Sequence, residues 1–119
     1  MKTFKDLQGI EGIDKLTECI PYVDEIFSDK KLFEEQNDAT WGETAVAIYK
    51  AHTDSMNKIF EALGEVPEST LGILNATTEI LKEIFVNEEL RSFFIGVSKN
   101  MKSVLLSMAN TVGGQSQGT

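Results

Sequence analysis

Hydrophobic positions recur at three- and four-residue steps along most of the chain, a spacing that places apolar side chains on one face of an α-helix. The clearest case lies between residues 71 and 85. Its apolar stripe consists of Ile73, Thr77, Ile80, Leu81 and Ile84, with Leu74 and Phe85 beside it. No alternation of period two persists over a useful length. We therefore predict an all-α fold and expect residues 71–85 to pack into the core.

The same pattern predicts a single compact domain of about five helices, some of them short. The expected helices cover residues 11–27, 30–35, 40–63, 71–85 and 88–110. Pro21 predicts a kink or a restart inside the first helix, because proline removes a backbone donor. Residues 1–9 are expected to be loose or a single turn. The helical domain thus covers residues 1–110, and residues 111–119, rich in Gly, Ser and Gln, form a flexible tail.

Local residue types mark where several of these helices begin and end. Asn87 precedes two acidic residues, so its side chain is expected to cap a helix that starts there. Ser69 or Thr70 can cap the helix before it. Gly64 has the residue type that commonly ends a helix in a left-handed conformation.

The last expected helix has a wide apolar stripe and is the best candidate for contacting another protein. Phe93 and Phe94 are adjacent and cannot point the same way, so one can lie in the core while the other faces a partner. Met101 is a flexible side chain suited to adaptable contacts. We predict a protein-binding surface that comprises Phe93, Phe94, Val97 and Met101. The alternative is that this helix simply closes the core.

The charge distribution limits the classes of partner. The chain has 119 residues and a formal net charge of −8. Residues 1–87 carry 8 basic and 17 acidic side chains, a net of −9, whereas residues 88–119 have a net of +1. This balance argues against nucleic acid and anionic membrane surfaces, which need clustered Lys and Arg. Since no apolar run approaches the roughly 20 residues of a membrane span and no signal-peptide pattern is present, we expect a cytoplasmic protein.

Three single residues are candidates for special roles. Cys19 is the only cysteine, and its apolar neighbours indicate a buried thiol. His52 is the only histidine and lies in an apolar stripe, which favours a hydrogen-bonded core residue over a metal ligand. Trp41 is the only tryptophan and is interpreted as a core anchor at a helix entry, the alternative being an interface residue.

No constellation of residues indicates an enzyme. The adjacent pairs Glu34–Glu35 and Glu88–Glu89 diverge by about 100° on a helix, so neither makes a natural acid–base dyad. The chain has no Glu-x-x-His metal motif, no glycine-rich phosphate loop before a helix and no nucleophile elbow. We predict no enzymatic activity: no catalytic residues, no cofactor and no metal. An enzymatic alternative would need a pocket around His52, Cys19 or a carboxylate.

The order of the segments carries a family resemblance. An acidic helical start ends in LTECIPYVDEIFSDKKLFEE and precedes ETAVAIYKAHTDSMNKIFEALGEVPEST and then LGILNATTEILKEIFVNEELRSFF. The positions that match are Ile59, Leu63, Gly64, Val66, Pro67, Glu68, Leu71, Ile80, Leu81, Ile84, Asn87, Glu89, Leu90, Phe93 and Phe94. Over roughly residues 7–95 the chain resembles the tail assembly chaperones of long-tailed phages and prophages of Gram-positive bacteria. It departs from the family pattern at Asn75-Ala76-Thr77, where a proline is frequent.

The resemblance implies a non-enzymatic role in the cytoplasm of the host cell. Such chaperones coat the helical, aggregation-prone tape-measure protein, help to recruit tail-tube subunits and leave before the tail is finished. The implied partners are the tape-measure protein and the tail-tube protein, with self-association along a long partner. A second hypothesis is a small acidic helical adaptor or inhibitor that binds a basic protein partner. Strong salt dependence of binding would favour this second hypothesis.

Overall fold

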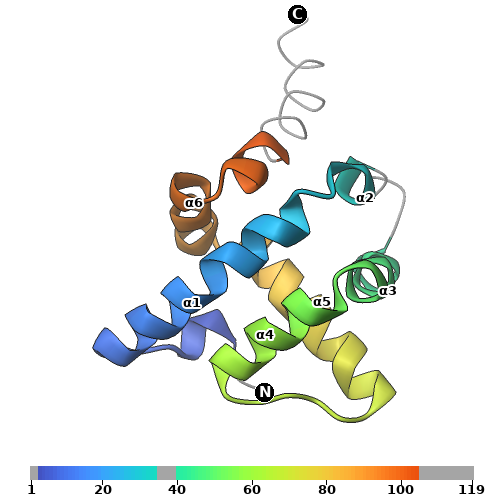
Figure 1. Ribbon diagram of the computed structural model, residues 1–119, viewed down its shortest axis with the longest axis horizontal. Helices are drawn as coiled ribbons and strands as arrows, with labels where there is room; N and C mark the ends of the chain where they lie inside the picture. The colour runs from blue at the N-terminus through green and yellow to red at the C-terminus, as the bar shows by residue number, and fades with distance from the viewer. Residues whose placement is uncertain (1–2, 35–39, 105–119) are drawn as a thin grey trace, which may run out of the picture.

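The computed structural model describes residues 3–34 and 40–104, and every regular element in these ranges is a helix (Figure 1). A 3₁₀ turn comes first and α-helices follow: η1 (Phe4–Asp6), α1 (Gly9–Phe27), α2 (Lys30–Glu34), α3 (Trp41–Ala51), α4 (Thr53–Leu63), α5 (Thr70–Val86) and α6 (Glu88–Val97). The predicted all-α fold is confirmed. After Ser98 the chain is helical again over residues 99–104. The expected tail over residues 111–119 lies outside the described residues.

Two pairs of helices contribute most of the core. α1 packs mainly along α4, and α3 packs mainly along α5 (Figure 1). Buried apolar side chains from all four helices form one cluster, which includes Cys19, Val23, Ile26, Phe27, Ala45, Ile48, Met56, Ile59, Phe60, Leu63, Ala76, Ile80, Leu81 and Ile84. The expectation that residues 71–85 pack into the core is met by the stripe at Ile80, Leu81 and Ile84, whereas Leu71 is 72% exposed.

An aromatic cluster joins the end of α1 to α2, α3 and α5. Phe27 stacks on Phe33 with ring centroids 4.4 Å apart and planes 8° apart. Phe85 lies against both rings and also against Trp41, whose ring centroid is 5.4 Å away. Trp41 is half-buried and begins α3, so its interpretation as a core anchor at a helix entry is confirmed.

The helix boundaries that depend on local residue chemistry are confirmed. Ser69 caps α5, because its Oγ accepts the Gly72 N–H at 3.0 Å. Asn87 caps α6 in the same way and accepts the Leu90 N–H at 3.0 Å. Gly64 ends α4 with a φ of 92°, a left-handed conformation that costs glycine little.

Pro21 does not break the first helix. α1 runs without interruption from Gly9 to Phe27 with Pro21 inside it, so the expected restart does not occur. Proline at this position removes the donor for the carbonyl of Thr17, one turn earlier. Both residues are exposed, on the side of α1 where water can satisfy that carbonyl.

The expected helix over residues 40–63 is instead two helices that meet at His52. His52 has φ −131° and ψ 45°, which is not helical, and it separates α3 from α4. The hydroxyl of Thr53 donates to the Tyr49 carbonyl at 2.6 Å, and a side chain bound to that carbonyl competes with the helical backbone bond. His52 is therefore a junction residue and not a member of one continuous stripe.

Candidate protein-interaction surface

The four residues of the predicted protein-binding surface do not lie on one exposed face. Phe94 and Met101 are fully buried, Phe93 is half-buried, and 43% of Val97 is exposed. Phe94 and Met101 therefore belong to the core, and of the four predicted residues only Phe93 and Val97 have apolar area open to solvent.

Of the two adjacent phenylalanines, one enters the core and the other stays partly exposed, as helical geometry requires. Neighbouring side chains on a helix point about 100° apart, so only one of them can enter the core fully. Phe94 does so and packs edge-on against Phe4, with ring centroids 5.6 Å apart. Phe93 packs against Phe94 at 5.3 Å and remains partly open to solvent.

The last expected helix, over residues 88–110, is interrupted at Ser98, three residues before the buried Met101. Ser98 has an extended backbone, with φ −122° and ψ 111°. Its hydroxyl accepts the Met101 N–H at 3.1 Å, the contact that a helix N-cap makes. A new helical segment starts there in a new direction and buries Met101 and Val104.

A carboxylate from α1 holds this interruption in place. Asp24 Oδ1 accepts the Ser98 hydroxyl at 2.7 Å and the Asn100 N–H at 3.2 Å. Asp24 Oδ2 accepts the Asn100 side-chain amide at 3.0 Å. These contacts join residues more than 70 positions apart in the sequence, and sequence reasoning missed them.

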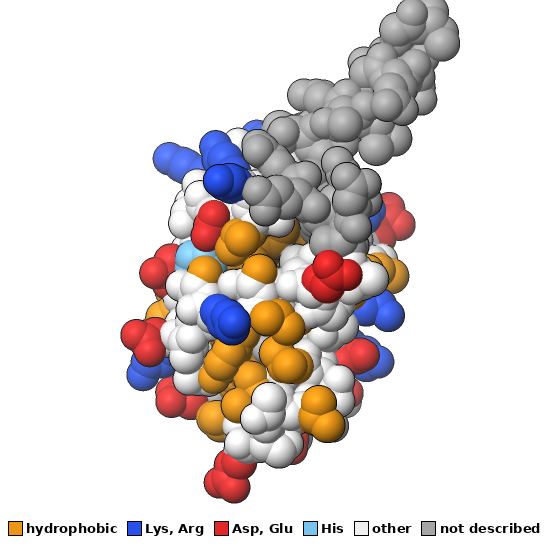
Figure 2. Space-filling view, turned by 90° about the vertical axis from the view of Figure 1, so that its right-hand side faces the viewer, with side chains coloured by type: hydrophobic (Ala, Val, Ile, Leu, Met, Phe, Trp, Pro, Cys, Tyr) orange, Lys and Arg blue, Asp and Glu red, His pale blue; other side chains and the backbone are white. Residues whose placement is uncertain are grey.

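Other large apolar side chains are exposed outside α6. Those with the largest exposed fractions are Ile10, Ile13, Val66, Leu71 and Val86. Figure 2 shows further apolar side chains gathered on the side of the molecule where α3 and the start of α5 lie. None of the helices in the described ranges is long and apolar enough to cross a membrane.

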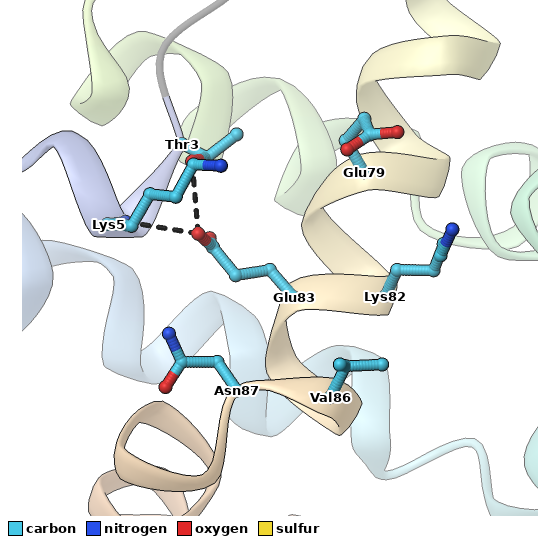
Figure 3. Close-up of a pocket in the computed structure, with 7 residues that line it drawn as sticks. All are labelled: Thr3, Lys5, Glu79, Lys82, Glu83, Val86 and Asn87. Carbon is cyan, nitrogen blue, oxygen red and sulfur yellow. Dashed lines mark hydrogen bonds between the residues drawn. The ribbon is translucent and has the colours of Figure 1, made fainter.

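A hollow of about 350 Å³ lies between η1 and α5 (Figure 3). Its lining consists of Thr3, Lys5, Glu79, Lys82, Glu83, Val86 and Asn87. Glu83 reaches from α5 to the turn and accepts the Phe4 N–H at 2.8 Å, the Lys5 N–H at 3.1 Å and the Thr3 hydroxyl at 3.0 Å. The carboxylate is thus already engaged by the protein's own chain. Sequence reasoning placed it only on the polar face of a helix.

His52 and Cys19 have the most reactive side chains among the candidate residues, and both make structural contacts. His52 Nε2 lies 3.2 Å from Asp29 Oδ2 and joins the junction of α3 and α4 to the residues after α1. Cys19 is fully buried, as predicted, and this burial raises the pKa of its thiol to about 12, with a smaller contribution from Glu18. Such a thiol is protonated at neutral pH and is a poor nucleophile. The described residues contain no group of three or more His, Cys, Asp or Glu that could hold a metal ion.

Comparison with known proteins gives no match to a protein-family model, to a curated protein or to a solved structure. Function is therefore inferred from the described contacts and from the order of the sequence segments. The features most relevant to function are the partly exposed apolar side chains of α6 and the carboxylates of Glu83 and Asp24, which attach neighbouring segments.

Proposed function

We propose that this protein is a non-enzymatic tail assembly chaperone of phage or prophage origin. It binds the tape-measure protein and helps to recruit tail-tube subunits in the cytoplasm of the host cell. The observation that carries the proposal is the order of the segments over roughly residues 7–95, from the acidic helical start to the paired phenylalanines.

The surface of α6 supplies a physical basis for such binding. Phe93 is half-buried and Val97 is 43% exposed, so both have apolar area left to bury against a partner. Full burial of one such side chain contributes about 1.5–3 kcal/mol. A helical partner with an apolar stripe is the natural occupant, since helix-in-groove recognition uses side chains at this spacing. The acidic body, with its net of −9 over residues 1–87, keeps the chaperone in solution while it holds an aggregation-prone partner.

Co-expression with a helical fragment of the tape-measure protein from the same genome tests the proposal. We expect the fragment to become soluble and to elute with this protein. Val97→Lys should weaken the complex at least about tenfold, because a charge would enter an apolar contact. Ile13→Lys is the matched control: Ile13 lies on α1, is 62% exposed and accepts a lysine without strain in the core. A fragment that stays insoluble, with no complex in the eluate, would contradict the proposal.

A second candidate function is an acidic adaptor or inhibitor of a basic protein. It is favoured by Glu11, Asp14 and Glu18, which are exposed on α1 at a spacing that places them on one side of the helix. Binding of this kind should weaken steeply between about 50 and 300 mM salt, because exposed charges are screened. Binding that is insensitive to salt and is lost in Val97→Lys would favour the chaperone.

A further inference from the structure

The η1 turn covers an aromatic side chain of α6. Thr3 and Phe4 are 7% and 5% exposed. The ring of Phe4 packs edge-on against the ring of Phe94, with centroids 5.6 Å apart and planes 71° apart. Phe93 packs edge-on against Phe94 as well, at 5.3 Å. If the turn moved away, the Phe94 ring would join Phe93 as an apolar surface of α6.

One carboxylate fastens the turn. Glu83 accepts hydrogen bonds from Thr3 and Lys5 (Figure 3). It also accepts one from Phe4, and two of the three bonds come from backbone N–H groups. Among the described residues, every hydrogen bond from residues 3–6 to helices α1–α6 ends on this carboxylate. Hydrogen bonds to an ionised carboxylate are roughly twice as strong as neutral ones. The polar part of the attachment thus depends on a single side chain.

The turn is also built to move as a unit. The Thr3 N–H donates to Asp6 Oδ2 at 2.8 Å, a contact within the turn that holds the pKa of the Asp6 carboxyl below its usual range. Leu7 and Gln8 are extended, with ψ values of 136° and 145°. Gly9 follows with φ 64°, which glycine adopts at little cost. A folded turn on an extended link can leave α5 with α1 still folded, once the contact of Leu7 with Gly12 of α1 breaks.

We propose that η1 is a latch, which Glu83 holds closed over a docking site on α5 and α6, and that a partner segment replaces the turn when the latch opens. The site accepts what the turn now presents: a large apolar side chain over Phe94, next to donors for Glu83. The occupant is therefore a protein segment that places a large apolar side chain over Phe94 and turns the backbone N–H of that residue and of the next one toward Glu83, as Phe4 and Lys5 do. The identity of that partner rests on the proposed function, whereas the latch itself does not.

Native-state hydrogen exchange on the full chain tests the latch. Glu83→Gln should speed exchange of the Phe4 and Lys5 amides by roughly tenfold or more, because the charge-assisted bonds are lost. The amides of α1 and α4 should keep their rates. Glu79→Gln is the matched control, since Glu79 lies one turn earlier on α5, is exposed and undergoes the same chemical change. Equal acceleration in every helix, or no acceleration at Phe4 and Lys5, would overturn the latch.

A peptide added in trans tests the docking site. The probe is a synthetic peptide of residues 2–8 (KTFKDLQ), offered to the full chain carrying Phe4→Ala. We expect it to bind this variant at least about tenfold more tightly than it binds the wild-type chain, whose own turn fills the site. The same peptide with Ala in place of Phe should not bind, and adding Glu83→Gln should remove binding. Equal binding in all these cases, or none in any, overturns the docking site. If Phe4→Ala does not fold, the Glu83→Gln exchange experiment decides.

Failure of this inference is separable from failure of the proposed function. Suppose that the Phe4→Ala variant binds the peptide but no variant binds a tape-measure fragment. The latch then stands and the proposed function falls. If instead the fragment binds the wild type and Phe4→Ala with equal affinity, the proposed function stands, and the role of the latch in partner binding is overturned. We expect Phe4→Ala to bind the fragment several-fold more tightly than the wild type, because the partner no longer competes with the turn.

Discussion

The core helices and the two segments that cross them are stabilised by different interactions. α1, α3, α4 and α5 meet through buried aliphatic and aromatic side chains that form one cluster. The η1 turn and residues 98–104 also bury apolar side chains, but each is attached by hydrogen bonds that converge on one acidic residue. Glu83 holds the turn, and Asp24 holds Ser98 and Asn100.

This difference determines how far a single substitution acts. Apolar burial is non-directional and shared among many neighbours, so a change in the core alters the stability of the whole domain. A carboxylate that accepts several hydrogen bonds concentrates the attachment of a segment in one residue. Its loss should release that segment first, with the four core helices still folded. The following substitutions test this contrast.

The largest effect is expected from truncation in the core. Ile80 of α5 is fully buried within the cluster. Ile80→Ala should lower the free energy of unfolding by about 2–5 kcal/mol, because it removes buried methyl groups and leaves a cavity. Urea unfolding followed by Trp41 fluorescence and by far-ultraviolet circular dichroism should give coincident transitions for wild type and variant. Two separate transitions in the variant would contradict a shared core.

Loss of the Asp24 carboxylate should have a smaller and more local effect. Asp24→Ala is expected to cost about 1–3 kcal/mol, since three hydrogen bonds to the side chain disappear. Exchange should rise at the Asn100 and Met101 amides before it rises in α4. Asp14→Ala is the control, because Asp14 lies on the same helix, is exposed and gains the same helix propensity. If both variants behave alike, the carboxylate does not attach the segment.

Boundaries that depend on neighbouring residues could be predicted from the sequence. Ser69, Asn87 and Gly64 each act within a few positions of themselves, so residue type and order were enough to locate the ends of α4 and α5 and the start of α6. Ser98 belongs to a residue type that favours N-caps, and it gave the same signal. The apolar stripe that continues past it masked that signal, so the last helix was expected to continue.

Contacts between distant residues could not be predicted in this way. Glu83 and Phe4 are 79 positions apart, and nothing beside either residue indicates the other. The division of residues 40–63 at His52 was missed because the apolar stripe keeps its spacing across the junction. That one of Phe93 and Phe94 enters the core could be predicted, but periodicity shows only which residues share a face, and the packed structure shows that Phe94 and Met101 are the covered ones.

Removing one helix cap tests whether a local hydrogen bond contributes less to the free energy of unfolding than a carboxylate that attaches a whole segment. Asn87→Ala should lower the free energy of unfolding by about 1 kcal/mol, because the Leu90 N–H loses its acceptor. Asn75→Ala is the control, since Asn75 is exposed to solvent in the middle of α5 and does not cap a helix end. Thermal unfolding of the two variants measures the difference. A loss in Asn87→Ala larger than that in Asp24→Ala would reverse the expected order.

At neutral pH the smallest effect is expected from ionisation of the one thiol in the core, because that effect appears only at alkaline pH. Burial raises the pKa of Cys19 from its ordinary 9.0 to about 12. The unfolded chain therefore releases this proton near pH 9.0, while the folded protein keeps it until about pH 12. The stability that comes from the neutral thiol is fully present below pH 9.0 and is lost as the pH rises through this window. Above pH 9.0 the folding equilibrium constant should fall by up to about tenfold per pH unit from this residue alone.

Cys19→Ala removes that contribution, so urea unfolding at about pH 8 and about pH 10 should show a smaller decline in the variant than in the wild type. Parallel declines would mean that the thiol ionises as easily inside the core as in water. That result would contradict the complete burial of Cys19 in the packing of α1 against α4.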